Sequence, residues 1–131
     1  MAAELGCKNS WEPLLYARSR IVHAAASNGL DAIDVPYLDL EDMDGMIKEA
    51  ELVRDLGFSG KGSIHPKQIP PLNEVFTPGE ETIRYAKTVV DAFKEADTGL
   101  VVLDGKLIEK PVIRHMERVL AISTKLSQNN T

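Results

Sequence analysis

The stretch Gly57–Ile69, GFSGKGSIHPKQI, decides the fold because it places a short strand between a helix stop and a proline. Gly57 is suited to ending a helix, and the strand that begins near Phe58 must stop at Pro66, which has no backbone N–H to donate. The glycines lack the GxGxxG spacing and precede a strand instead of opening a helix. A tight entry into a strand is therefore favoured over a nucleotide-binding loop.

Helical patterns lie on the N-terminal side of this stretch, around an earlier strand. Residues 10–29 predict a helix with Ser10 as its cap, and residues 40–57 predict a strongly amphipathic helix closed by Gly57. Residues 32–35, AIDV, predict a strand that ends at Pro36. The apolar face expected for the first helix consists of Leu14, Ala17, Ile21, Ala24 and Ala25.

On the C-terminal side, prolines at 66, 70 and 71 predict an irregular or single-turn stretch through residues 66–76. The sequence TPGE at 77–80 predicts a capping box, with Thr77 as the cap of a helix that runs to about Ala96. Asp104-Gly105 predicts a type I′ hairpin between LVVL and KLIE. Pro111 opens a last helix, and the polar residues 127–131 are expected to fray.

The order of elements alternates helices and strands before it ends in a hairpin and a helix. Such alternation predicts parallel βα units and an α/β fold. Two parallel strands are few for a sheet that needs cover on both faces, which suggests the end of a larger fold.

Composition excludes several classes of function. The 131 residues carry 15 basic and 20 acidic side chains, for a net charge of −5, so neither a nucleic-acid footprint nor a membrane-binding basic patch is present. There is one cysteine and no long apolar run or signal-peptide pattern, which predicts a cytoplasmic protein, with the mitochondrial matrix as the open alternative.

Few side chains suggest a site by their position alone. The three histidines are far apart, so a zinc site is not expected. His65 follows a parallel strand, where ligands bind in α/β folds, and it either lines a site or makes a structural hydrogen bond. Asp34 lies inside an apolar strand and either points into a barrel mouth or is paired, since a buried carboxylate needs partners. The acids Asp39, Glu41, Asp42 and Asp44 open a helix, and capping is favoured over metal binding.

Four stretches carry a family resemblance: YARSRIVHAAASNGLDAIDVPYLD, AELVRDLGFSGKGSIHPKQI, EVFTPGEETIRYAKTVVDAF and LDGKLIEKPVI. They resemble the C-terminal half of the citrate lyase β-subunit and malyl-CoA lyase family. The resemblance implies a (β/α)8 barrel that binds Mg²⁺ and an acyl-CoA and that makes or breaks a carbon–carbon bond beside the thioester. It also implies trimers or larger oligomers, in which the C-terminal hairpin covers the barrel mouth of a neighbouring subunit.

A complete barrel of this kind takes about 250 residues. The resemblance therefore assigns residues 1–98 to a partial (β/α)8 barrel containing its last two βα units, 99–126 to a hairpin–helix lid, and 127–131 to a disordered tail. The metal ligands of the family belong to strands outside this sequence, so no metal ligand is expected here.

The expected function is a fragment of a Mg²⁺-dependent acyl-CoA lyase, inactive alone, with a trimer-like homo-oligomer or a complementary N-terminal half chain as its partner. The alternative is a non-catalytic assembly or regulatory module that docks with a full-length paralogue. A weaker reading is another acyl-CoA or pyruvate aldolase of the same barrel class.

The resemblance also supplies the site residues. The family has an Asp after its DGKxI motif, as the base that moves a proton at the acyl-CoA α-carbon, and here that position is Glu109. A glutamate keeps the carboxylate on an arm longer by one methylene, and the competing reading is an acid that simply precedes a helix. The wall for coenzyme A is expected at Asp34, Pro36, Ile64, His65 and Pro66.

Overall fold

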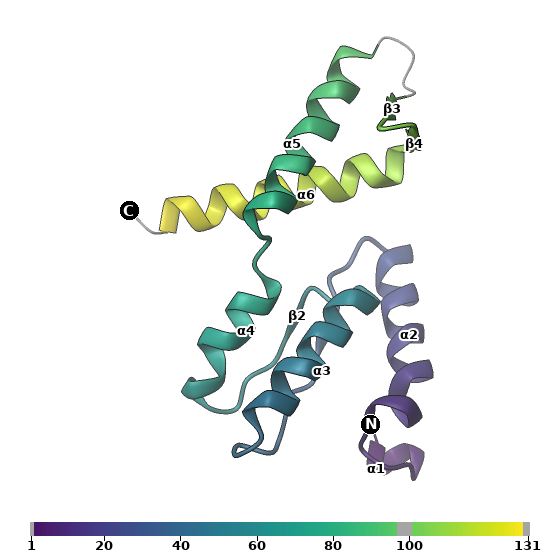
Figure 1. The fold of residues 1–131 in the computed structure, drawn as a ribbon. Helices are drawn as coiled ribbons and strands as arrows, with labels where there is room; N and C mark the ends of the chain where they lie inside the picture. Colours follow the sequence, from purple (N-terminus) through teal and green to yellow (C-terminus); the bar gives the residue numbers. More distant parts are fainter. Residues whose placement is uncertain (1, 97–100, 130–131) are drawn as a thin grey trace. The chain divides into compact units, whose positions relative to one another are not determined.

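The computed structural model describes residues 2–96 and 101–129 and shows a mixed α/β chain that is mostly helical. The chain divides into two compact units, residues 1–76 and 77–131, and each is described by itself (Figure 1). The boundary expected between residues 98 and 99 lies outside the described residues and stays a prediction. No helix in the described part of the chain is long and apolar enough to cross a membrane.

The first unit contains two strands among its helices. The strands β1 (Ile33–Asp34) and β2 (Gly60–Lys61) pair in parallel, with Ile33 opposite Gly60 and Asp34 opposite Lys61. The strand predicted at 32–35 is thus present but shorter. The other elements are α1 (Ala2–Leu5), α2 (Trp11–Ser27), α3 (Met43–Leu56), the 3-10 helix η1 (Pro66–Gln68) and α4 (Ile69–Phe76).

Helix α3 ends at the predicted position, begins at Met43 and not at residue 40, and buries the face expected from its apolar spacing. Met46, Ala50 and Val53 are at most 1% exposed, at the three- and four-residue spacing that puts them on one side of a helix. The helix ends at Gly57, whose φ of 114° strains any residue with a Cβ. The apolar face of α3 packs in two clusters, with Ala32 and Phe58 in one and with Leu72 in the other.

Helix α2 buries part of the predicted face, with Leu14 in the core and Ala25 packed against the cluster around Val53, but its inward stripe is shifted. Ile21 is 43% exposed, whereas Leu14 and Arg18 are 2% and 1% exposed. The inward stripe also includes Trp11 and Val22, which pack against the cluster around Val53. The prediction was right for Leu14 and Ala25 and wrong for Ile21, because it followed apolar residues alone and the inward stripe includes Arg18.

The proline-rich stretch 66–76 is helical, contrary to the irregular or single-turn structure predicted for it. Pro66 begins η1, while Pro70 and Pro71 lie in the first turn of α4. The N–H groups of a first turn have no partner within the helix, so a residue that lacks one is tolerated there.

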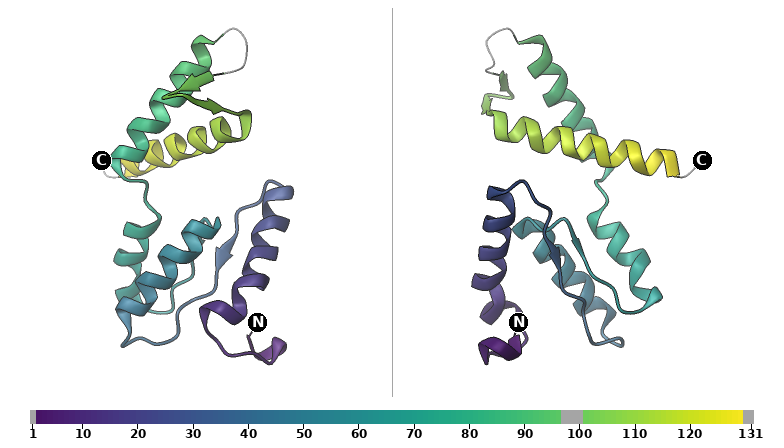
Figure 2. Two further views of the ribbon diagram at one scale, coloured as in Figure 1. Left: turned by 45° about the vertical axis from the view of Figure 1, so that its right-hand side comes forward. Right: turned by 180° about the vertical axis from the view of Figure 1, so that it is seen from behind.

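The second unit packs a hairpin against two helices. Its elements are α5 (Glu80–Glu95), β3 (Val101–Leu103), β4 (Lys106–Ile108) and α6 (Lys110–Asn129). Figure 2 shows the hairpin between the end of α5 and the start of α6. Asp104 and Gly105 have φ values of 50° and 74°, as a type I′ turn requires, which confirms the predicted hairpin.

The start of α5 and the end of α6 differ from the sequence-based prediction. The cap of α5 is Gly79, without a side-chain hydrogen bond, so the capping box at Thr77 is wrong. The helix begins instead with Glu80 and Glu81, whose charges suit the helix N-terminus. Residues 127–129 belong to α6 and not to a frayed tail, while residues 130 and 131 lie outside the described part.

Candidate functional site

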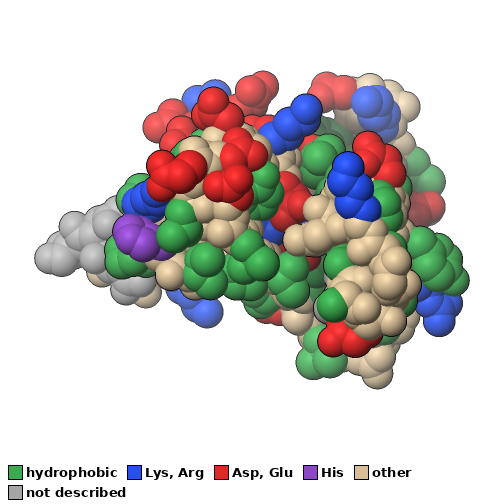
Figure 3. Space-filling model, turned by 90° about the horizontal axis from the view of Figure 1, so that it is seen from below, with side chains coloured by type: hydrophobic (Ala, Val, Ile, Leu, Met, Phe, Trp, Pro, Cys, Tyr) green, Lys and Arg blue, Asp and Glu red, His purple; other side chains and the backbone are tan. Residues whose placement is uncertain are grey.

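The two parallel strands present different side chains on their two faces. Asp34 and Lys61 are 4% and 9% exposed and lie opposite each other in register. Ile33 and Val35, the residues on either side of Asp34 in the chain, are 61% and 49% exposed. Successive side chains of a strand point to opposite faces, so one face of the pair is buried and polar and the other is accessible and apolar. Hydrophobic side chains are likewise visible at the surface in Figure 3.

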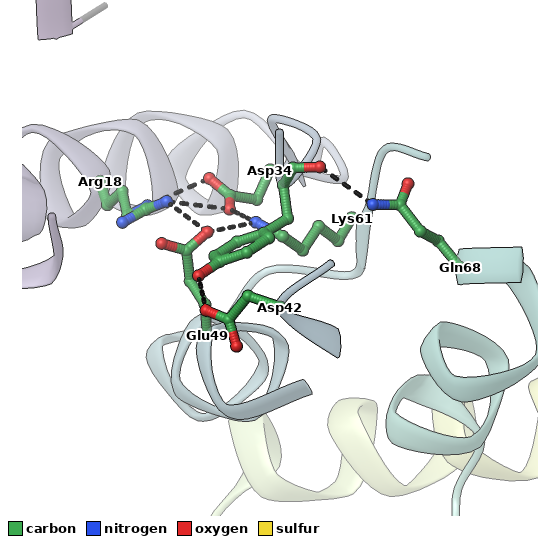
Figure 4. A network of polar contacts seen from close by, with 7 residues as sticks. Arg18, Asp34, Asp42, Glu49, Lys61 and Gln68 are labelled. Atoms are coloured by element: carbon green, nitrogen blue, oxygen red, sulfur yellow. Dashed lines mark hydrogen bonds and ion pairs between the residues drawn. The ribbon is translucent and has the colours of Figure 1, made fainter. Parts of the chain in front are cut away.

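Four charged residues form a cluster on the buried face (Figure 4). The carboxylate of Asp34 accepts hydrogen bonds from Nε and Nη2 of Arg18, at 3.1 and 3.2 Å, and from Nζ of Lys61 at 2.6 Å. Glu49 accepts from the same lysine at 2.6 Å and lies 3.2 Å from Arg18 Nη2. Two cations and two carboxylates balance, and the short charge-assisted bonds offset the cost of removing them from water.

The arginine of this cluster is also fixed from its other side. Its guanidinium carbon lies 5.3 Å from the centroid of the Trp11 ring, a cation–π contact. Arg18 Nη1 is buried and has no hydrogen-bond partner among the residues that the structure describes. The cluster thereby ties α2, β1, α3 and β2 together just where both strands end.

A carboxamide joins the loops that follow the strands. Gln68, 1% exposed, donates from Nε2 to the backbone oxygen of Tyr37 at 2.9 Å (Figure 4). Its Oε1 accepts from the backbone N–H of Ile64 at 2.9 Å. The first loop follows β1 and the second follows β2. Neither this bridge nor the Arg18 contact was predicted from the sequence.

Next to this bridge, a phenol and a carboxylate share a hydrogen bond. The hydroxyl of Tyr37 donates to Asp42 at 2.7 Å, which raises the pKa of Tyr37 to about 12 and lowers the pKa of Asp42. Asp42 also accepts from the backbone N–H of Gly45 at 2.9 Å and so caps α3. A Cβ on Gly45 would overlap both side chains. The acidic residues before α3 therefore include a helix cap, as the sequence favoured.

The predicted ligand-lining residues lie on the two strand-end loops, except Asp34. Ile64, His65 and Pro66 are exposed, and Pro36 is half-buried. His65 makes a structural hydrogen bond, in which Nδ1 accepts from the backbone N–H of Lys67 at 3.1 Å. Asp34 is engaged with Arg18 and Lys61, so its contact with a ligand stays a prediction, as does site lining by the other four.

Glu109 belongs to the second unit, between β4 and α6. Its backbone oxygen accepts from the N–H groups of Val112 and Ile113, at 2.9 and 3.3 Å, so it occupies the cap position of α6. The side chain is exposed, and no partner holds its carboxylate within the described residues. Its role as a base stays a prediction.

Among residues 2–96 and 101–129, no group of three or more His, Cys, Asp or Glu side chains is arranged to hold a metal ion. The carboxylates of Asp34, which is buried, and Glu49, which is half-buried, are neutralised by Arg18 and Lys61. The described residues therefore do not fit a magnesium site.

The model of the HpcH/HpaI aldolase/citrate lyase family matches residues 1–66. The chain belongs to this family. The citrate lyase subunit beta of Leuconostoc mesenteroides subsp. cremoris is 36% identical over 115 residues, which cover 86% of this chain and 38% of that protein. The mitochondrial citramalyl-CoA lyase of Rattus norvegicus is 36% identical over 120 residues, or 89% of this chain and 36% of that protein.

One solved structure matches almost the whole chain. The CitE protein of Mycobacterium tuberculosis, in complex with magnesium, acetoacetate and coenzyme A, has a TM-score of 0.77 and 29% identity. The match covers 95% of this chain and 49% of that one. The family resemblance seen in the sequence is thus confirmed, and the chain spans less than two fifths of the length of these two curated relatives.

Proposed function

We propose that this chain provides the C-terminal portion of a magnesium-dependent lyase that cleaves a carbon–carbon bond beside an acyl-CoA thioester. Citryl-CoA, malyl-CoA and citramalyl-CoA form the substrate class. Residues 1–98 contribute the last two βα units of a (β/α)8 barrel, and the hairpin with α6 is a lid for a neighbouring copy in a trimer-like oligomer. Alone the chain is inactive, because the magnesium ligands come from a complementary segment.

The observation that carries this proposal is the match to CitE over 95% of the chain, since that protein was solved with magnesium, acetoacetate and coenzyme A. The curated relatives are named for citrate lyase and citramalyl-CoA lyase, two reactions on related substrates. Because this one match covers 95% of the chain, it supports a joint role of the strand-end loops and the hairpin in one enzyme.

For coenzyme A, we propose the wall formed by Pro36, Ile64, His65 and Pro66, with Asp34 supporting the strand ends from inside. Ile64 is 50% exposed and offers an apolar contact for the pantetheine arm. The side chain of Lys67 is 39% exposed and lies 3.5 Å from Glu41, a weak pairing that leaves it suited to an anionic phosphate. These residues thus fit the two chemical ends of the ligand.

For the proton transfer, we propose Glu109. In the cleavage direction the carbinol hydroxyl loses its proton to solvent and its carbon becomes the ketone of the departing keto acid, while the bond from that carbon to the α-carbon breaks. Glu109, in its protonated form, then delivers a proton to the α-carbon of the thioester enolate and is reprotonated from solvent, so the two proton transfers balance. In the reverse direction it removes that proton. Its exposure supports this role, as does the lack of a partner for its carboxylate among the described residues, because a base must reach its proton directly.

The test is reconstitution. The chain is coexpressed with the part of a curated relative that precedes the matched region, and release of keto acid from each of the three acyl-CoA substrates is measured. Glu109→Gln should lower kcat about 100-fold or more, and Glu109→Asp should keep activity. Glu117→Gln, an exposed acid on α6, is the matched control. Full turnover by Glu109→Gln would remove the residue from the mechanism, and no turnover by a folded complex would contradict the lyase proposal.

The second candidate is an assembly or regulatory module that docks with a full-length paralogue. It is favoured by the exposure of the large apolar side chains on either side of Asp34, 61% for Ile33 and 49% for Val35. Analytical ultracentrifugation distinguishes the lyase fragment from the module. Association with a paralogue without turnover supports the module, and a monomer that does not bind the paralogue excludes the module.

A further inference from the structure

The loops after β1 and β2 approach each other closely at one point. A Cβ added to Gly62 would lie 3.0 Å from Cγ and 3.1 Å from Cδ of Pro36. Such a separation is tighter than ordinary van der Waals contact, so a side chain at position 62 would push the two loops apart by a few tenths of an ångström. Pro36 stands on one loop, and Ile64 and His65 stand on the other, so the spacing of the loops determines the shape of any surface that they form together.

Gln68 is the side chain that sets this spacing. Its Nε2 donates to Tyr37 O and its Oε1 accepts from Ile64 N–H, both at 2.9 Å. A backbone carbonyl only accepts and a backbone N–H only donates, so a single orientation of the carboxamide satisfies both. A carboxylate would bring a second acceptor against the carbonyl, and an apolar side chain would leave both backbone groups unpaired.

Both sides of the bridge are anchored. Gln68 lies at the end of η1, where its own N–H donates to His65 O at 3.0 Å and the His65 ring caps the turn. On the other side, the Tyr37 hydroxyl is bonded to Asp42, which caps α3. The carboxamide therefore connects two loops that are each fixed to a helix end.

We infer that Gln68 is a positioning residue that holds the two strand-end loops at the separation required to bind coenzyme A. This inference rests on the proposed function, because it takes coenzyme A as the ligand of these loops. Gln68 itself acts from beneath, through the backbone of Tyr37 and Ile64, since its side chain is 1% exposed.

The test measures binding of free coenzyme A to the 131-residue chain by isothermal titration calorimetry at pH 7.5. Gln68→Met removes donor and acceptor at nearly constant volume and should weaken binding about tenfold or more. Gln128→Met, an exposed glutamine on α6, is the matched control and should bind like the unchanged chain.

A second variant separates positioning from general loss of stability. Gln68→Glu introduces a carboxyl group that presents two acceptors when ionised, but a donor and an acceptor when protonated. Its affinity for coenzyme A, divided by that of the unchanged chain, should rise as the pH is lowered from 8 to 5. His65, Asp42, Glu41 and Lys67 are present in both proteins, so this ratio reports the introduced group. A uniformly destabilised protein would show a flat or falling ratio.

The possible binding results separate failure of the inference about Gln68 from failure of the proposed ligand. If the unchanged chain binds coenzyme A and Gln68→Met binds it equally well, the inference is overturned while the proposed ligand stands. If the unchanged, folded chain does not bind coenzyme A, the proposed ligand fails, and the role of Gln68 in binding it fails too. If Gln68→Met does not fold, the pH profile of Gln68→Glu decides: recovery at low pH supports positioning, and a flat ratio overturns it.

Discussion

The first unit has a charged interior beside its apolar clusters, and the second unit is held by apolar contacts. In the first, Arg18, Asp34 and Lys61 are buried at the strand ends. In the second, the core cluster consists of Val89, Val101, Ile108 and Ile113. An apolar core tolerates exchange of similar shapes, whereas a buried charge network demands particular partners. The network adjoins the loops assigned to ligand binding. The unit with the buried charge network therefore also carries the proposed wall for coenzyme A.

The largest effect is expected from Asp34→Asn, which tests whether the charge network stabilises the first unit. Removing this carboxylate leaves two buried cations with Glu49 as their single acid, so the free energy of unfolding of the first unit should fall by about 4 kcal/mol. Denaturant titration measures the loss. Asp91→Asn, at an exposed position on α5, is the control and should change the stability by less than about 0.5 kcal/mol. A loss below about 1 kcal/mol for Asp34→Asn would mean that the network is not the centre of this unit.

In the second unit, Ile113→Ala tests the apolar interior. Ile113 is 4% exposed, so its truncation should cost about 3 kcal/mol through lost burial and a cavity, while Ile113→Val should cost about 1 kcal/mol. Both are read from the denaturation of the second unit. Val102→Ala, at a side chain that is 68% exposed, serves as the control. Equal costs at positions 113 and 102 would contradict the assigned core.

The hairpin turn gives a smaller effect. Gly105 has a φ of 74°, so Gly105→Ala should destabilise the second unit by about 1 kcal/mol. Gly79→Ala is a matched control, because an added Cβ meets nothing within 4 Å at either glycine and only Gly105 has a positive φ. In thermal denaturation, Gly105→Ala should have a lower Tm than Gly79→Ala. The reverse order would argue against the type I′ turn.

The smallest expected effect concerns the Tyr37–Asp42 hydrogen bond and depends on pH. The folded-state pKa of Tyr37 is raised to about 12, so its contribution is present below the ordinary tyrosine pKa, about 10, and is lost as the pH rises toward 12. The lowered pKa of Asp42 means that the contribution is also lost as acid protonates that carboxylate, below about pH 4. The stability difference between the unchanged chain and Tyr37→Phe should therefore be constant from about pH 4 to 10 and shrink outside this range. Denaturation at pH 3, 7 and 11 measures it, and a difference independent of pH would contradict the bond.

Local patterns predicted much of the fold. The apolar spacing of α3, its stop at Gly57 and the Asp104-Gly105 turn are short-range features, and the structure has all three. The capping box failed because a cap depends on where the backbone first becomes helical, and that occurs at Glu80 and not at Pro78. The helix α4 was missed because prolines in a first turn look like breakers when the start of the helix is unknown.

The site was harder to predict because its interactions join distant residues. Arg18 and Asp34 are 16 positions apart, and Gln68 and Tyr37 are 31 apart. One signal was available for the arginine: it stands on the stripe of Trp11, Leu14, Val22 and Ala25, where a charge needs a buried partner, and Asp34 lies in an apolar strand. No comparable pattern indicated Gln68, because a glutamine after a proline turn is ordinary at a surface.

Lys61 offers a chemical reporter of the first unit. Its ammonium group lies 2.6 Å from an oxygen of Asp34 and from one of Glu49, and its side chain is 0% exposed. Amine-reactive reagents label solvated lysines first, so this amine should acquire its label only when the strands separate. The rate at which the peptide that contains Lys61 gains the mass of the label would then measure how fast the two strands separate. This measurement needs no substitution in the chain.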